Sequence, residues 1–213
     1  NLLLEEYENP QQPIPFKMAP LVLIGTLITH LVGGSAGREG TAVQMGGAIA
    51  DQFSRWFQLD KNDRKTILIL GISAGFASVF GTPLAGALFA LEVVYFSKIN
   101  FKSVILSFAV AYAAYFTMEF WQVQHTHYTI SILPEMNEIH LLWTIGAGIL
   151  FGLAALLFSR IAHFWSRLFL KYIPYAPIRP LIGGTVLAVI LFFIGTTKYI
   201  GLGVPEIVKA FST

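Results

Sequence analysis

The feature that most constrains this chain is a glycine-rich run at 33–41, GGSAGREGT, between two apolar segments. Its position predicts that the run lies within or at the edge of a bilayer, where backbone N–H groups have no bulk water as a partner. The segment 39–57 is predicted to be a helix, so the free N–H groups of its first turn and the positive end of its dipole converge on one spot. That spot is a predicted anion site, and it carries its own carboxylate, Glu39.

The composition favours a membrane protein. Hydrophobic residues make up 55% of the chain and charged residues 12%, whereas a soluble domain usually carries about 25% charged residues. The 19 glycines and 10 prolines suit broken, closely packed membrane helices. A net charge of +2 is too small to imply nucleic-acid binding, and the lack of cysteine excludes disulfides and thiolate chemistry. The first residue is not Met, so we expect a piece of a longer chain.

The order of predicted elements indicates an all-α membrane domain over 1–213. A polar, proline-rich segment at 1–16 with a short helix at Leu2–Tyr7 precedes a series of apolar helices, predicted at 17–33, 39–57, 63–80, 83–97, 101–118, 140–172 and 178–195, and a last helix opens after Gly201. Asp60 or Asn62 is the predicted N-cap of the third apolar helix. Short helices interrupted by Gly and Pro are typical of transporters built from inverted repeats, so we expect the first repeat and the start of a second.

Two sequence blocks resemble a known family. The first block has GREGT at 37–41, VQ at 43–44 and GG at 46–47, and the second has AGFA at 74–77 and TPLAGALFALE at 82–92. Their content and spacing are similar to the CLC chloride channels and anion/proton antiporters. The resemblance implies a CLC-type bundle of tilted and broken transmembrane helices. It also implies a homodimer with one anion pathway in each subunit, embedded in lipid as a multi-pass protein of the bacterial inner membrane.

Within this family the chain looks most like the fluoride/proton antiporter branch. Thr41 stands where chloride-type members usually have Pro, and Val93 stands where chloride/proton antiporters often carry an inward glutamate. The branch also alters a chloride-type serine near the chain start, and Asn1 is read as the last trace of that site. The expected function is proton-coupled fluoride export, and the alternatives are a chloride/proton antiporter or a passive chloride channel.

The resemblance implies that Glu39 is the external gating glutamate. A carboxylate at membrane depth costs several kcal/mol unless it is paired or protonated. Ionised Glu39 is expected to occupy the place of the anion at the helix N-terminus, and protonated Glu39 is expected to leave it. This exchange couples protons to fluoride, or to chloride, without a metal or a cofactor. The structural alternative is a buried ion pair between Glu39 and Arg38.

Further anion-binding candidates flank Glu39. Gly37 and Gly40 let the backbone approach an anion closely, Thr41 offers a hydroxyl, and Arg38 draws anions from an external vestibule. Glycines in membrane helices also serve packing, which is the interpretation that we favour for the other four glycines of this region, Gly33, Gly34, Gly46 and Gly47. Aromatic ring edges carry partial positive charge, so Phe76 and Phe80, near the second helix break at Gly81–Pro83, are included.

Two patterns point to other classes of protein. The run Gly33–Gly37 fits the nucleophile pattern of serine hydrolases, with His30 as the only nearby histidine. That turn should follow a strand, whereas here it follows an apolar helix. His125 and His127 suggest a metal site, but no further His or Cys is near in sequence, so a polar loop is the better interpretation.

Overall fold

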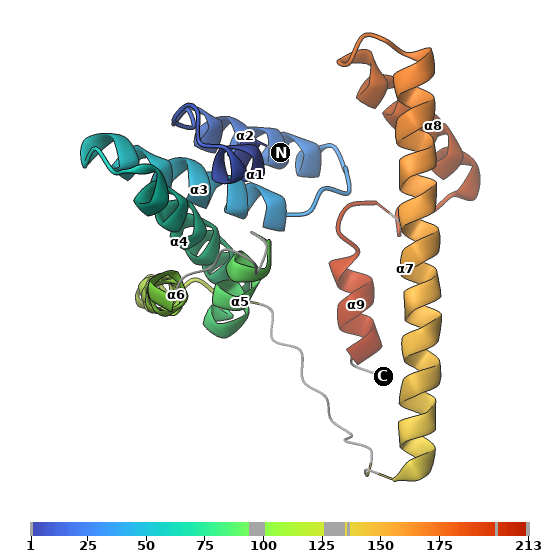
Figure 1. Cartoon of the computed structure of the whole chain (residues 1–213). Coiled ribbons are helices and arrows are strands. Elements are labelled where there is room, and N and C mark those ends of the chain that lie inside the picture. The colour runs from blue at the N-terminus through green and yellow to red at the C-terminus, as the bar shows by residue number, and fades with distance from the viewer. Residues whose placement is uncertain (1, 94–100, 126–134, 136, 199, 212–213) are drawn as a thin grey trace. The chain divides into compact units, whose positions relative to one another are not determined.

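A computed structural model of the chain describes residues 2–93, 101–125, 135, 137–198 and 200–211. Over these residues the structure consists of helices and contains no strand (Figure 1). The helices are α1 (Leu2–Glu8), α2 (Met18–Leu31), α3 (Glu39–Trp56), α4 (Lys61–Phe80), α5 (Pro83–Val93), α6 (Phe101–Phe120), α7 (Glu138–Tyr172), α8 (Ile178–Ile194) and α9 (Val204–Phe211). The predicted all-α fold is confirmed for this part of the chain. The predicted end of α5 at 97 lies outside the described residues.

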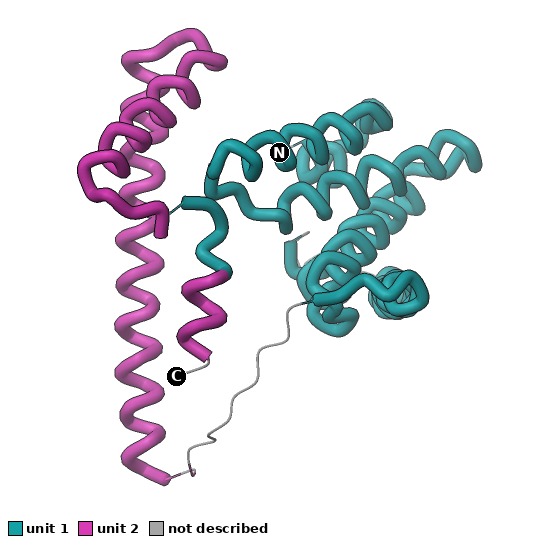
Figure 2. Tube along the Cα trace, turned by 180° about the vertical axis from the view of Figure 1, so that it is seen from behind, with its two compact units in different colours: residues 1–127, 200–204 teal, residues 128–199, 205–213 magenta. Residues whose placement is uncertain are grey.

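The contacts divide the chain into two compact units (Figure 2). Unit 1 comprises residues 1–127 and 200–204 and contains α1 to α6, whereas unit 2 comprises residues 128–199 and 205–213 and contains α7, α8 and most of α9. The candidate site lies wholly in unit 1. The expectation of a single transmembrane domain over 1–213 stays a prediction.

Two of the helices, α6 and α7, are long and apolar enough to cross a membrane. In α6 only small or flexible side chains are buried, namely Ser103, Ser107, Ala111 and Met118. The 35-residue helix α7 has no buried residue in its unit. Helices of this length and composition are those expected of a membrane protein.

The ends of α4 follow from local sequence. The Asp60 side chain accepts hydrogen bonds from the backbone N–H groups of Asn62 and Asp63, both at 2.8 Å. Asp60 is therefore the N-cap, and the alternative cap, Asn62, is wrong because its own N–H is one of the groups that Asp60 caps. At the other end Gly81 adopts a left-handed conformation, with φ +66°, which glycine reaches without steric cost.

Small residues bring α3 and α4 into close contact. A Cβ built on Gly46 would collide with the carbonyl oxygen of Gly71, and one built on Gly71 would collide with the carbonyl oxygen of Gly46. Gly75 likewise approaches the carbonyl oxygen of Ala42. Gly47, on α3, faces the Leu3 side chain so closely that a Cβ would overlap it. The packing role expected of Gly46 and Gly47 is confirmed.

Hydroxyl groups join α4 to α5 and α6. Ser73 Oγ donates to the backbone carbonyl of Ser107 at 3.0 Å, and Ser107 Oγ lies 3.2 Å from Ser73 Oγ and 3.3 Å from the carbonyl of Ala87. Both serines are fully buried. Because all of these polar atoms find partners, the three helices pack without a buried unsatisfied hydroxyl at this crossing.

A buried charge cluster, made of Arg64, Asp51 and Glu6, fixes the N-terminal segment onto α3 and α4. Arg64 forms two hydrogen bonds to Asp51, with Nε···Oδ1 at 2.7 Å and Nη2···Oδ2 at 2.8 Å, and one to Glu6 at 3.1 Å. Asp51 also accepts from the backbone N–H of Ile14 at 2.6 Å, and it has no exposed side-chain surface. Every charge of the cluster has an opposite charge beside it, which a buried ion requires.

Candidate functional site

The glycine-rich run joins α2 to α3 by a tight turn. The N–H of Gly33 donates to the carbonyl of His30 at 3.0 Å, and the N–H of Gly34 donates to the carbonyl of Thr29 at 2.7 Å. Gly33 has φ +78°, a left-handed conformation that only glycine adopts easily. After this turn the chain runs on to Arg38, the residue that precedes α3.

The N-terminus of α3 carries no side-chain cap. Arg38 occupies the N-cap position with φ −81° and ψ −20° and forms no capping hydrogen bond. The first intrahelical bond joins the N–H of Ala42 to the carbonyl of Arg38 at 3.0 Å. The N–H groups of Glu39, Gly40 and Thr41 precede it and have no partner within the helix. These donors and the helix dipole make the end of α3 suited to an anion.

The carboxylate of Glu39 folds back over the backbone of Gly37. A Cβ built on Gly37 would overlap Oε2 of Glu39, so the carboxylate occupies the space that any other residue would fill. Glu39 is exposed in the described chain. The structural alternative, an ion pair with Arg38, does not form, since the ion pairs among the described residues do not join Arg38 to Glu39. Glu39 is thus a carboxylate with room to move.

Gly40 and Thr41 differ in what surrounds them. A Cβ at Gly40 would meet no atom within 4 Å, so close packing within the described residues does not require glycine there. The Thr41 hydroxyl lies 2.5 Å from the Thr26 hydroxyl on α2. Sequence reasoning missed Thr26, whose only signal was a polar side chain in a mostly apolar helix.

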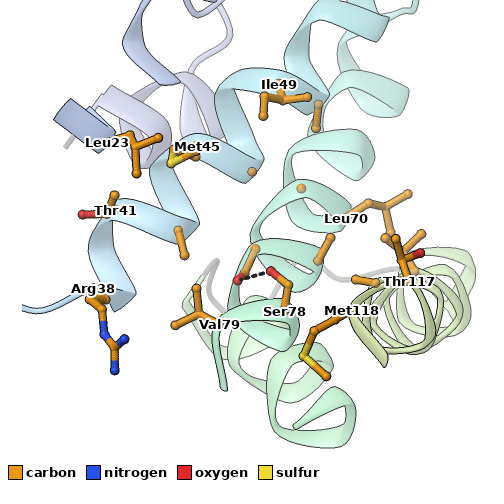
Figure 3. Close-up of a pocket in the computed structure, with 18 of the residues that line it drawn as sticks. Leu23, Arg38, Thr41, Met45, Ile49, Leu70, Ser78, Val79, Thr117 and Met118 are labelled. Carbon is orange, nitrogen blue, oxygen red and sulfur yellow. Dashed lines mark hydrogen bonds between the residues drawn. The ribbon is translucent and has the colours of Figure 1, made fainter. Parts of the chain in front are cut away.

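Arg38 and Thr41 line a groove of about 880 Å³ in unit 1. Figure 3 shows the two side chains at one end of it, with Met45 and Ile49 further along α3. The lining is mostly apolar and comes from α2, α3, α4 and α6 and from residues next to the ends of α3 and α6. Its polar side chains are few: Thr26, His30, Arg38, Thr41, Ser78 and Thr117. Half of this polar set, Thr26, His30 and Thr41, lies on α2 or in the first turn of α3.

Phe76 and Phe80 belong to a separate aromatic cluster. The ring of Phe76 stacks on Phe89 with centroids 4.2 Å apart and lies 4.5 Å from the ring of Phe80. Neither Phe76 nor Phe80 is among the residues that line the groove with Arg38 and Thr41. The structure therefore does not bring these rings into the groove. Asn1, the remaining candidate, lies outside the described residues.

The hydrolase pattern at 33–37 does not assemble a nucleophile and base. Ser35 Oγ donates to the carbonyl of Gly201 at 2.6 Å, and Nε2 of His30 bonds to the carbonyl of Ala36 at 2.7 Å. Each side chain is engaged by a backbone oxygen. The turn also follows a helix, α2, where the hydrolase pattern requires a strand.

The predicted His125 loop is described only in part. His125 Nε2 bonds to the carbonyl of Ser78 at 3.1 Å, whereas His127 lies outside the described residues. Within the part of the chain that the structure describes, no three His, Cys, Asp or Glu side chains gather as metal ligands would.

Comparisons with known proteins agree with this architecture. The family model for the voltage gated chloride channel matches residues 1–213. A protein of Pseudomonas syringae pv. tomato named chloride/fluoride channel protein is 45% identical, over 99% of this chain and 48% of its own length. A Vibrio cholerae protein named H(+)/Cl(-) exchange transporter is 30% identical, over 74% of this chain and 34% of its own length.

A solved structure is similar over almost the whole chain. The crystal structure of a CLC-type fluoride/proton antiporter superposes with a TM-score of 0.89 at 30% identity, covering 97% of this chain and 52% of that protein. The all-helical architecture expected from the two sequence blocks is confirmed by this match. The chain spans about half the length of the Pseudomonas relative and of this antiporter, and 34% of the length of the Vibrio relative.

Proposed function

Because this chain belongs to the voltage gated chloride channel family, we propose that it is part of a proton-coupled fluoride exporter of the bacterial inner membrane. The family consists of integral membrane channels and transporters, so the chain is not an enzyme and the serine hydrolase alternative is excluded. Fluoride as the transported ion is supported by the Pseudomonas relative named for chloride and fluoride and by the match to a fluoride/proton antiporter. Thr41 and Val93, which resemble the fluoride/proton antiporter branch, also favour fluoride over chloride.

One observation carries the proposal: the Glu39 carboxylate lies over Gly37 at the uncapped start of α3. Ionised Glu39 is the intramolecular competitor of an incoming anion, because both are attracted by the same first-turn N–H groups. Protonation removes its charge and with it that attraction. The neutral side chain then leaves, and fluoride enters. Return of the carboxylate after loss of the proton expels the anion. Each cycle therefore exchanges a proton for a fluoride ion.

The remaining residues tune the site for fluoride. Fluoride is small and strongly hydrated, so it requires several donors at short range. We assign these to the N–H groups that Gly37 and Gly40 leave accessible and to the Thr41 hydroxyl. Arg38 raises the local anion concentration from the groove. Phe76 and Phe80 stay candidates, through their ring edges, for another position on the pathway.

The test is flux through proteoliposomes that contain the full-length protein. Fluoride efflux and external pH are recorded together for the native protein, for Glu39→Gln and for Glu119→Gln, an exposed acid at the end of α6. We expect fluoride efflux to drive proton uptake in the native protein and in the Glu119 variant. In Glu39→Gln the coupled proton flux should be abolished. Coupled proton flux that persists in Glu39→Gln would exclude Glu39 as the proton carrier.

The alternative functions are separated by the same assay. The Vibrio relative named an H(+)/Cl(-) exchange transporter favours a chloride/proton antiporter, and the Pseudomonas relative named a channel protein favours a passive channel. Chloride efflux coupled to protons, without fluoride efflux, would select the first of these. Anion efflux without any pH change in the native protein would select the second. The homodimer implied by the family is part of the proposal, and light scattering of the detergent-solubilised protein measures it.

A further inference from the structure

One face of α2 contacts the segment that carries Glu39 at two points. Thr26 and His30 lie four residues apart, so their side chains project from the same face of the helix. Both line the groove, where Thr26 meets Thr41 and His30 meets Ala36.

His30 contacts the segment that precedes Glu39 in the sequence. Its Nε2 is 2.7 Å from the carbonyl oxygen of Ala36. Because a carbonyl can only accept, Nε2 carries the hydrogen and donates it. Ala36 stands three residues before Glu39 and next to Gly37, the residue over which the Glu39 carboxylate lies. The imidazole therefore fixes the backbone next to Gly37, over which the carboxylate lies.

Thr26 contacts Thr41, which lies two residues after Glu39. The two hydroxyl oxygens of Thr26 and Thr41 are 2.5 Å apart, and one of them donates to the other. When Thr26 is the donor, the hydrogen of the Thr41 hydroxyl is left free to point at an anion. Thr26 thus orients the donor that Thr41 offers as well as the first turn of α3.

We propose that Thr26 and His30 are positioning residues, which hold the Thr41 side chain and the Ala36 backbone on the two sides of Glu39 while its carboxylate moves. This inference rests on the proposed function, because it assigns the two residues a part in that same proton-coupled exchange. With both contacts in place, leaving and returning of the carboxylate involve side-chain rotation alone. Without either contact the segment 36–41 moves with Glu39, and an anion passes without a proton.

The experiment measures protons moved per fluoride in proteoliposomes of the full-length protein. His30→Leu and Thr26→Val each remove one hydrogen bond, whereas His30→Gln and Thr26→Ser keep a group able to form it. Matched controls are His163→Leu and Thr185→Val, because His163 Nδ1 bonds to the carbonyl of Ser159 and Thr185 Oγ1 donates to the carbonyl of Leu181, each within its own helix. Size-exclusion chromatography first confirms that each variant is folded.

We expect His30→Leu and Thr26→Val to lower the number of protons per fluoride by about fivefold, the change that corresponds to one ordinary hydrogen bond. His30→Gln and Thr26→Ser should recover most of the coupling, and the two controls should match the native protein. A native ratio in both His30→Leu and Thr26→Val, with Glu39→Gln uncoupled, would overturn this inference and leave the proposed function standing. Full coupling in Glu39→Gln would overturn both. If His30→Leu does not fold, Thr26→Val decides alone.

Discussion

Asp51 and Glu39 are two carboxylates of the same helix, α3, in opposite surroundings. Asp51 has no exposed side-chain surface, pairs with Arg64 through two hydrogen bonds, and accepts a third from the backbone of Ile14. Glu39 is exposed, lies beside glycines, and has no ion-pair partner among the described residues. The first carboxylate is held from several directions, whereas no ion pair within the described part of the chain holds the second.

The difference shows that one helix carries a buried, paired acid and an exposed acid, and the proposed mechanism requires the exposed one to move. A buried carboxylate is tolerated only with its partners in place, so Asp51 binds the N-terminal segment to α3 and α4 and keeps the helix still. A carboxylate that must exchange with an anion needs free donors in front of it and no competing partner. Glycine at 37 and the uncapped start of α3 supply this condition. The stability of one end of the helix supports the movement proposed at the other.

The largest effect is expected for Asp51→Ala. This change leaves the Arg64 guanidinium buried without its main partner, and breaking such a pair lowers the free energy of unfolding by about 3–5 kcal/mol. Thermal unfolding of the full-length protein in detergent measures it. The control is Asp63→Asn, which removes an exposed pair with Lys102 at 3.3 Å and should cost less than about 1 kcal/mol. Equal stability of both variants would show that the buried charge cluster does not hold the fold.

Two glycine substitutions test the comparison at an intermediate scale. The new methyl in Gly71→Ala meets the backbone of Gly46 and the side chain of Ala50, so α3 and α4 must separate, at a cost of about 1–3 kcal/mol. The methyl in Gly37→Ala meets the flexible end of Glu39, which moves aside. We expect Gly71→Ala to unfold at a lower temperature with unchanged coupling in the protein that stays folded.

Gly37→Ala is expected to show the reverse pattern, with native unfolding and a changed number of protons per anion. Unfolding temperature and coupled flux are measured on the same preparations of the two variants. If Gly37→Ala transports protons and fluoride in the native ratio, the position of the Glu39 carboxylate over Gly37 has no part in the mechanism.

The smallest effect on stability is expected for Glu39→Gln. Because Glu39 has no ion pair to lose among the described residues, the unfolding temperature should change by no more than about 2 °C. The same variant is expected to lose all proton coupling, so stability and transport separate at this position. A loss of stability close to that of Asp51→Ala would instead identify Glu39 as a structural acid and contradict the comparison.

Much of the fold was predictable because helix signals are local. Apolar runs broken by glycine and proline predicted helices whose ends agree closely with those of the structure, such as 39–57 for α3 and 178–195 for α8. Asp60 was one of two predicted caps, with Asn62 as the other, because capping needs only the next three residues. The glycine-rich run was likewise recognisable as the start of a helix with free N–H groups.

Other features could not be predicted because they depend on residues far apart in the chain. Asp51 meets Ile14 across 37 residues, and Ser35 meets Gly201 across 166. Neither Thr26 nor Arg64 had a sequence signal that named its partner. Phe76 and Phe80 lie near the second helix break in sequence, yet their rings pack into an aromatic cluster apart from the groove.

The sequence by itself determined the helices, the membrane character and a single acid at the start of α3 between glycines. These features depend on hydrophobicity, backbone freedom and hydrogen bonds over a few residues, all of which are set by residues adjacent in the sequence. Only the tertiary structure decided that Asp51 is buried and paired while Glu39 is exposed. It alone also decided that α2 contacts the chain on both sides of Glu39. The physical reason is that the freedom of a carboxylate depends on the donors and cations around it, and packing alone brings those together.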